Sequence, residues 1–282
     1  MKTELFKGRT VLIATMHQKE KVIAPPLENS LGLKTQLCPT LNTDLFGTFC
    51  GEKARTESPI ETARSKCLKA LAITGLDLAI ASEGSFGPHP SLYFTAADVE
   101  TLVMIDQKHQ LEFVVTEISL NTNFSAKAIG NLEELKDFAQ LTGFPDHGLI
   151  LRRSVDSYED QVKGITDEQV LESHFEQLMS LYGQAYVETD MRAMHNPTRM
   201  TVIAQAMDKL IDLLGRECPQ CKTPGFVVSE AIPGLPCDLC GLPTRSILYH
   251  RFLCQKCNFA EDKMYPYQKE KEDPMYCDFC NP

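Results

Sequence analysis

Four Cys-x-x-Cys pairs near the C-terminus constrain this chain more than any other feature. Two cysteines three residues apart can turn both sulfurs toward one ion, and a second pair completes a closed tetrahedral site. Ordinary buried cysteines would not repeat one spacing four times, so the pattern predicts two Cys₄ metal sites. The eight predicted ligands are Cys218, Cys221, Cys237, Cys240, Cys254, Cys257, Cys277 and Cys280.

Structural Zn²⁺ is the expected ion at both sites, and an iron–sulfur cluster is the alternative. Fifteen residues separate the first two pairs and nineteen separate the last two. Both gaps suit a ribbon in which consecutive pairs share an ion. We therefore predict that the first and second Cys-x-x-Cys pairs bind one ion and that the third and fourth pairs bind the other. The alternative is a cross-braced arrangement, in which the pairs that share an ion alternate along the chain. Closed Cys₄ sites would replace the hydrophobic core that a segment this short can hardly build alone.

Composition narrows the class of protein. The net charge of −10 disfavours nonspecific binding to nucleic acid or to anionic membranes. No apolar run approaches the roughly 20 residues that a membrane span requires, and residues 1–6 lack the apolar stretch of a signal peptide. Eleven cysteines without a secretion signal argue for reduced thiols. We therefore expect a cytoplasmic protein without a membrane partner.

The remaining sequence alternates between strand and helix patterns. This alternation predicts an α/β domain over residues 1–215, a mixed sheet with flanking helices, followed by a double zinc-ribbon domain over residues 216–282. A glycine-rich turn is expected over 82–88. Strands are expected over 10–15, 76–81, 100–106, 111–119 and 148–153, and those over 100–106 and 111–119 are expected to form a hairpin. Helices are expected from about 17 (interrupted at Pro25 and Pro26), over 58–75, from 131, and over 197–214. The predicted helix signals are a capping box of Ser58 and Glu61, caps at Asn131 and Asn196, and an apolar stripe of Val202, Ala206, Leu210 and Leu213 on the last helix.

Charged residues gather just before the last of these helices. Glu188, Asp190, Arg192, His195 and Arg199 fall within twelve residues. Helix N-termini attract anions, arginine suits phosphate, and carboxylates beside bound phosphates are common Mg²⁺ ligands. The segment predicts a phosphate site, with a surface salt-bridge network at a domain junction as the alternative.

Three other segments resemble a known family. They are Ser58-Pro-Ile-Glu-Thr-Ala-Arg-Ser-Lys66, the Thr74-Gly-Leu turn, and a strand that closes on Ser82-Glu-Gly84. Together they resemble the ITPase-like fold of the inosine/xanthosine triphosphate pyrophosphatases. Ala14-Thr15 is similar to the first phosphate-binding turn of that family, and His17 stands where the family has Asn. The resemblance covers about residues 10–215.

The resemblance and the charge pattern together predict a Mg²⁺-dependent hydrolase of a nucleotide or a related phosphorylated small molecule, a nucleotide pyrophosphatase-like enzyme. The alternative is a noncatalytic binding protein whose zinc ribbons recognise protein or nucleic acid. Under the hydrolase hypothesis, one set of predicted site residues consists of carboxylates that hold Mg²⁺ or activate water, and a second set binds phosphate. The carboxylates are Glu52, Glu61, Glu83 and Asp190, and the phosphate-binding candidates are Thr15, His17, Lys19, Lys66, Arg192 and Arg199.

The whole chain is also similar to an uncharacterised bacterial family that carries a domain of unknown function. The shared segments are 13–17, 82–90 and 189–200, together with the cysteine-rich tail. This second resemblance implies no activity.

Overall fold

The computed structural model describes residues 4–38 and 57–282. The chain divides into two compact units, one formed by residues 6–210 and the other by residues 211–282 with the N-terminal residues up to Leu5. Glu52, one of the predicted carboxylates, lies outside the described residues.

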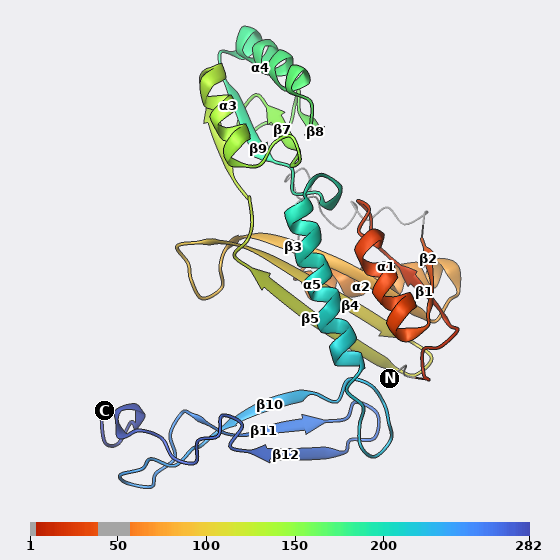
Figure 1. The fold of residues 1–282 in the computed structure, drawn as a ribbon, viewed down its shortest axis with the longest axis vertical. Helices are drawn as coiled ribbons and strands as arrows, with labels where there is room; N and C mark the ends of the chain where they lie inside the picture. Colours follow the sequence, from red (N-terminus) through yellow and green to blue (C-terminus); the bar gives the residue numbers. More distant parts are fainter. Residues whose placement is uncertain (1–3, 39–56) are drawn as a thin grey trace. The chain divides into compact units, whose positions relative to one another are not determined.

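A five-stranded sheet forms the centre of the 6–210 unit (Figure 1). Its strand order is β2-β1-β3-β4-β5; β1 pairs in parallel with β2 and β3, whereas β3, β4 and β5 are antiparallel. The predicted hairpin between β4 and β5 is confirmed. The strands are β1 (Thr10–Ile13), β2 (Lys34–Leu37), β3 (Leu78–Pro88), β4 (Ala96–Asp106) and β5 (Leu111–Ser119).

Two helices connect the parallel strands. α1 (Glu20–Leu31) leads from β1 to β2, and α2 (Pro59–Thr74) leads back to β3 on the other side of β1. Ser58 and Glu61 begin α2 with the predicted capping box. The buried side of α2 packs on the sheet face that carries Leu12 and Ala14, and Figure 1 draws α1 in front of the opposite face. The chain therefore reverses its direction of travel at β1, where α/β sheets form their ligand crevice at the carboxyl ends of the strands.

Two local predictions were wrong. The helix expected to break at Pro25 and Pro26 runs through both, because buried Ile23 and Leu27 hold it on the sheet. The expected turn over 82–88 is the second half of β3, which stays paired with β4 as far as Pro88. Tertiary packing and strand pairing outweighed the local Pro and Gly signals at both places.

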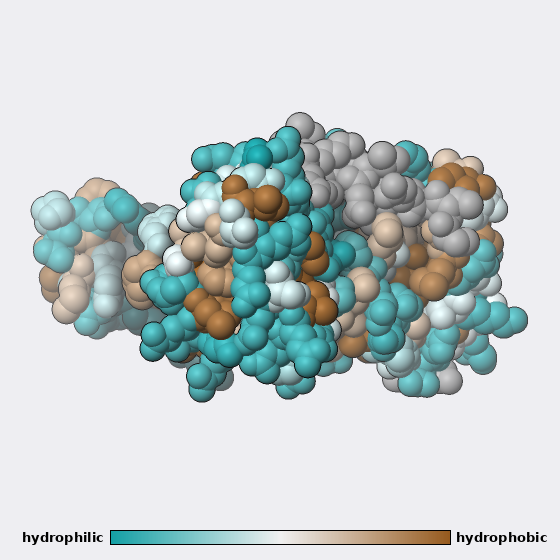
Figure 2. Space-filling model, turned by 90° about the horizontal axis from the view of Figure 1, so that it is seen from above, coloured by the Kyte–Doolittle hydropathy of each residue, from teal (hydrophilic) through white to brown (hydrophobic). Residues whose placement is uncertain are grey.

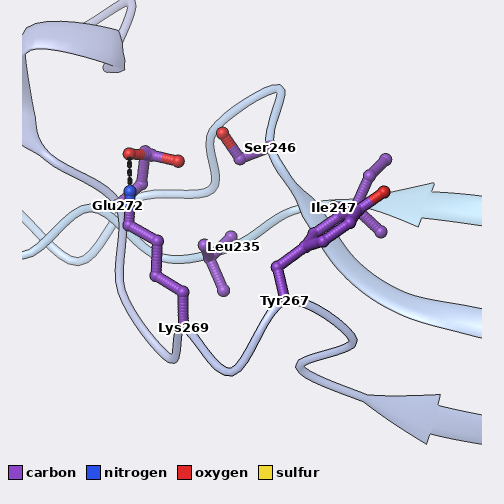
Figure 3. Close-up of a pocket in the computed structure, with 6 residues that line it drawn as sticks. All are labelled: Leu235, Ser246, Ile247, Tyr267, Lys269 and Glu272. Atoms are coloured by element: carbon purple, nitrogen blue, oxygen red, sulfur yellow. Dashed lines mark hydrogen bonds and ion pairs between the residues drawn. The ribbon is translucent and has the colours of Figure 1, made fainter.

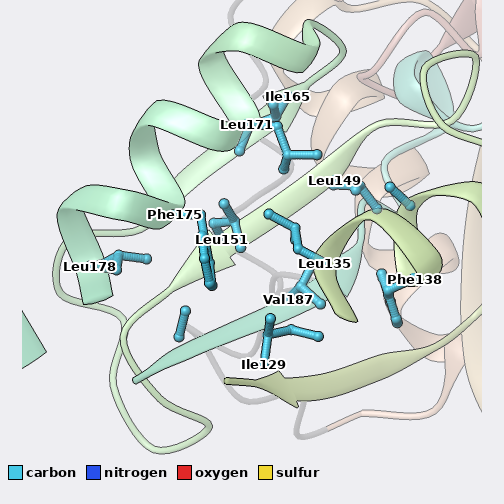
Figure 4. Packing of buried hydrophobic residues seen from close by; sticks show 12 residues of the cluster. Ile129, Leu135, Phe138, Leu149, Leu151, Ile165, Leu171, Phe175, Leu178 and Val187 are labelled. Carbon is cyan, nitrogen blue, oxygen red and sulfur yellow. The ribbon is translucent and has the colours of Figure 1, made fainter. Parts of the chain in front are cut away.

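The second sheet of this unit is antiparallel and has four strands in the order β6-β9-β7-β8. Two helices, α3 (Leu132–Leu141) and α4 (Glu168–Tyr182), cover one face of it, and Figure 4 shows their apolar side chains meeting those of the strands. Asn131 caps α3 as predicted. The mixed α/β class is thus confirmed. The strands are β6 (Ala126–Ile129), β7 (Leu149–Arg152), β8 (Val162–Ile165) and β9 (Ala185–Thr189).

The longest helix, α5 (Pro197–Leu214), follows a short 3₁₀ turn, η2 (Ala193–His195). Asn196 caps it, because its side-chain oxygen accepts a hydrogen bond from the Arg199 amide at 2.9 Å. Val202, Ala206 and Leu210 of the predicted apolar stripe are buried along one side of the helix, whereas Leu213 is only half-buried.

The 211–282 unit contains a three-stranded antiparallel sheet in the order β10-β11-β12. Its apolar core is small: Phe226, Phe252 and Phe259 cluster around Cys218 and Cys254. A core of this size agrees with a unit that bound metal stabilises. Its elements are β10 (Val228–Pro233), β11 (Ile247–Leu253), β12 (Ala260–Met264) and η3 (Pro274–Tyr276).

The face of the molecule drawn in Figure 2 is mostly hydrophilic where it is coloured. In the view of Figure 2, teal hydrophilic areas surround small and separate brown hydrophobic ones. Within the part of the chain that the structure describes, no helix combines the length and the apolar character that crossing a membrane requires.

Candidate functional site

The eight predicted metal ligands form two groups. Within each group the four ligand atoms lie within 4.8 Å of one another. Cross-pair Sγ–Sγ distances such as 3.5 Å between Cys221 and Cys254 and 3.7 Å between Cys240 and Cys277 suit four thiolates around one ion. Each group can therefore hold a metal ion. The first tetrad is Cys218, Cys221, Cys254 and Cys257, and the second tetrad is Cys237, Cys240, Cys277 and Cys280.

The predicted sequential pairing was wrong, and the rival interleaved pairing is present. The strands give the reason, because β10 separates the first pair from the second and β11 separates the second from the third. Seven residues of strand span about 23 Å, much farther than one tetrahedral site reaches. Antiparallel strands thus bring the first and third pairs to one end of the sheet and the second and fourth pairs to the other.

Each Cys-x-x-Cys pair forms a tight turn, called a knuckle below, and all four knuckles have the same backbone hydrogen bond. The amide four residues after the first cysteine donates to the carbonyl of that cysteine, at 2.9 Å for Lys222, 2.9 Å for Gly241, 3.1 Å for Asn258 and 2.8 Å for Asn281. The first three of these residues have positive φ angles, which glycine and asparagine adopt most easily. A repeated turn of this kind holds both sulfurs of a pair on the same side.

A cluster of buried charges lies at the carboxyl end of β1. Beyond β1, the loop that leads to α1 lies beside β3, and the Lys19 ammonium donates a hydrogen bond to Ser82 Oγ at 2.9 Å. Lys19 is buried. Burial, together with the positive charge of Arg199, lowers the pKa of Lys19 to about 7. The predicted phosphate ligands Lys19 and Arg199 therefore act on each other electrostatically.

Two carboxylates on β4 belong to this cluster. Asp98 and Glu100 are two residues apart and thus on the same face of the sheet, with 1% and 0% of their surface exposed. Both oxygens of Asp98 and Oε2 of Glu100 are buried without a hydrogen-bond partner among the residues described. Burial and the neighbouring Glu100 raise the pKa of Asp98 to about 8. The sequence prediction missed both residues, although two acids inside an apolar strand pattern are a usable signal.

Arg199 joins α5 to this strand. Its Nε donates to Glu100 Oε1 at 2.5 Å, a further nitrogen donates to the Met191 carbonyl, and its guanidinium lies 5.0 Å from the Phe86 ring centre. Gly84 faces the same pair, because any Cβ there would overlap the Glu100 carboxylate and the Arg199 guanidinium. The close approach of these groups explains why glycine stands inside this strand.

The predicted phosphate ligand Lys66 and the predicted carboxylate Glu83 form a buried ion pair with each other. Glu83 alternates with Ser82 and Gly84 along β3, so its side chain points to the α2 face of the sheet rather than to the Glu100 face. The strand thus separates two charged groups, with Lys66 and Glu83 on one face and Lys19, Asp98, Glu100 and Arg199 on the other.

The remaining predicted residues have other surroundings. Glu61 is exposed, and its carboxylate accepts hydrogen bonds from Ser58, which makes it part of the α2 cap. Asp190 binds the guanidinium of Arg192 at 2.5 and 3.0 Å. Thr15 Oγ1 is buried without a hydrogen-bond partner in the described chain, and His17 adopts a left-handed backbone conformation with φ 65°. Such backbone strain is common near binding sites.

A polar patch lies on the face of the β6-β9-β7-β8 sheet that the helices leave uncovered. Arg152 lies between the rings of Tyr158 and Tyr186, at 4.8 and 4.9 Å, and pairs with Glu188 at 3.0 Å. Gln161 directly precedes β8, and both polar atoms of its amide are buried without a partner among the residues described. Nε of Arg152 and Oε1 of Glu188 are likewise buried without a partner in the described chain.

Comparison with known proteins assigns the chain to a family. Curated proteins of known function include no match. The matched family region begins at Lys66, so it contains both tetrads, Asp98, Glu100 and Arg199 but not Lys19. Because the family described as Domain of unknown function (DUF6671) matches residues 66–282, well over half of the sequence, the chain belongs to that family.

Proposed function

We propose that the 6–210 unit hydrolyses a phosphorylated small molecule of the nucleotide class, with Mg²⁺ held by Asp98 and Glu100. We further propose that each cysteine tetrad holds a structural Zn²⁺. The resemblance of residues 10–215 to the ITPase-like fold supports the first proposal, and the closed four-thiolate donor sets support the second.

The buried Asp98 and Glu100 pair carries the proposal. Three of their four carboxylate oxygens have no hydrogen-bond partner in the described structure, and leaving such oxygens buried is costly. One or two carboxylates plus substrate phosphates are the usual Mg²⁺ ligands. A bound Mg²⁺ would polarise a phosphoryl oxygen and neutralise its charge. Among the described residues, sets of three or more gathered metal ligands occur only at the cysteines, so substrate and water would supply the remaining ligands.

Two cations face the same region. Lys19 approaches from the loop after β1 and Arg199 from the first turn of α5. Phosphoryl transfer depends mainly on positioning and on charge neutralisation, and these two side chains provide both. Their location at the carboxyl end of β1, where the sheet connections reverse, is where α/β sheets bind ligands.

The resemblance of residues 10–215 to the inosine/xanthosine triphosphate pyrophosphatases supports a nucleotide over other phosphorylated molecules. Sugar phosphates are the comparison that tests this choice of substrate class.

The test is release of phosphate and pyrophosphate by the full chain with added Mg²⁺. The substrate panel comprises ITP, XTP, the common nucleoside triphosphates and several sugar phosphates. We expect turnover of a nucleotide that falls by about a hundredfold or more in Asp98→Asn, because a metal ligand is lost. Asp137→Asn, at an exposed position on α3, is the matched control and should retain activity. Absence of turnover across the panel, from folded protein carrying two metal ions, would overturn the proposal.

The zinc proposal has its own measurement. Elemental analysis of the purified chain should give two zinc atoms per chain, with neither iron nor the visible absorbance of an iron–sulfur cluster. Iron in place of zinc would contradict it.

A further inference from the structure

The two tetrads differ in what their knuckles expose. The knuckles of the first tetrad contain only Pro219, Gln220, Gln255 and Lys256 between their cysteines. In the second tetrad, Leu239 lies between one pair of cysteines and Phe279 between the other, with 74% and 66% of their surfaces exposed. Because the four sulfurs of this tetrad are gathered within 4.8 Å, each of the two knuckles at this one site carries an exposed apolar side chain.

A pocket of about 280 Å³ adjoins the second tetrad (Figure 3). Leu235, Ile247 and the ring of Tyr267 line it, together with Ser246 and the Lys269–Glu272 ion pair. Its walls are joined to both knuckles. Glu272 bonds to the Pro236 carbonyl at 2.8 Å, and Arg245, next to Ser246, pairs with Asp278 at 2.9 Å.

The size of the pocket restricts its occupant. Sites for drug-sized ligands occupy about 300–1,000 Å³, and this pocket falls just below that range. It suits a single large side chain of another protein. A buried apolar anchor inside a polar rim is how protein interfaces obtain most of their binding energy.

The charges around the pocket indicate which charge a binding partner carries. Segments 235–246 and 267–282 carry five acidic residues (Asp238, Glu270, Glu272, Asp273, Asp278) and three basic ones (Arg245, Lys269, Lys271). Each of the three cations is already ion-paired with one of these acids. Glu270 and Asp273 remain as the excess negative charge. Phosphate backbones need uncommitted cations beside aromatic platforms, so this surface suits nucleic acid poorly. A second copy of this chain is disfavoured by like-charge repulsion, because each copy has a net charge of −10.

We propose that the second tetrad is a docking site for a protein segment that inserts one large apolar side chain into the Tyr267 pocket and carries lysine or arginine beside it. The metal holds the two knuckles in position, and Leu239 and Phe279 contact the apolar flank of the segment. This site is independent of the hydrolase proposed above and would serve a noncatalytic chain equally well.

The test is selection from a phage-displayed library of random peptides on the full, metal-loaded chain. We expect enrichment of peptides with a large apolar residue flanked by Lys or Arg. Synthetic copies should bind about tenfold or more weakly to a Leu239→Asp, Phe279→Asp double variant, as expected for the loss of interface anchors. Leu141→Asp, at an exposed leucine on α3, should bind as the parent does.

Several results would overturn the proposal. They are a failure to enrich any sequence, enrichment of acidic sequences, and equal binding by the double variant. Tighter binding of a single-stranded oligonucleotide than of any selected peptide would do the same. Two metal ions per chain in the double variant establish that its knuckles remain folded. If they are lost, Tyr267→Ala, away from the cysteines, takes its place with the same expected weakening.

Discussion

The cysteine tetrads and the buried charge cluster differ in how far apart in the sequence their residues lie. Each tetrad uses pairs that are adjacent in sequence, so a repeated spacing identifies every ligand. The charge cluster draws Lys19, Asp98, Glu100 and Arg199 from a loop, a strand and a helix far apart in the chain. A local pattern thus identifies the members of a site but not their partners, whereas a site built by packing is visible only when the sheet is known.

The largest effect should come from breaking the tetrads two cysteines at a time. Cys221→Ser with Cys257→Ser affects one tetrad and should leave one metal ion per chain, whereas Cys221→Ser with Cys240→Ser affects both and should leave none. Structural zinc in small domains is worth about 10–16 kcal/mol, so the affected part should lose its fold. Elemental analysis and amide hydrogen exchange measure both effects. Sequential pairing would give the reverse stoichiometry.

The next effect is in the charge cluster. Arg199→Ala leaves Glu100 buried without its cation and should lower the free energy of unfolding by about 3–5 kcal/mol in urea titration. Arg245→Ala, which breaks an exposed pair of the 211–282 unit, should change it within error. Equal losses in the two variants would show that burial does not separate the two kinds of pair.

Gly84 tests how tightly the cluster is packed. Gly84→Ala places a Cβ against Glu100 and Arg199 and should cost about 1–3 kcal/mol, as overpacked cores do. Gly87→Ala, on the same strand with open space around its Cβ position, is the control. A stable Gly84 variant would mean that the Arg199 contact is looser than the structure has it.

A smaller effect depends on pH and involves neither site. Burial alone would raise the pKa of Asp106, but the Arg9 and His109 hydrogen bonds lower it below its ordinary value. A depressed folded-state pKa stabilises the protein above the unfolded pKa, near 4, and this contribution is lost as the pH falls through the folded value. Urea titrations at pH 7 and pH 3 should therefore differ less for Asp106→Asn than for the parent. An unchanged difference would remove Asp106 from the acid response.

Local signals predicted the parts of the fold that local chemistry determines. The Ser58 capping box, the Asn131 and Asn196 caps and the β4–β5 hairpin are confirmed. The length of β3 was missed, because pairing with β4 carries the strand through two glycines that resemble a turn. The tetrad pairing was missed for a related reason, since strand length separates knuckles that are close in sequence.

The site residues that a local pattern marks were predicted, and some of those that tertiary packing brings together were not. All eight predicted cysteines are metal-ligand candidates in the structure, but they group into tetrads other than the two predicted ones. Lys19 and Arg199 were named as phosphate ligands and lie in the cluster, but Asp98 and Glu100 were not named. Their carboxylates are conspicuous only after the sheet register buries them on one face.

Binding of Mn²⁺, a spectroscopic substitute for Mg²⁺, is the direct test of whether Asp98 and Glu100 hold a divalent cation. The full chain, carrying its tightly bound metal ions, would be titrated by electron paramagnetic resonance without any substrate. We expect one Mn²⁺ site per chain that is lost in Asp98→Asn and Glu100→Gln and retained in Asp137→Asn. A chain that binds no Mn²⁺, or that binds it equally well without these carboxylates, would show that Asp98 and Glu100 are not metal ligands.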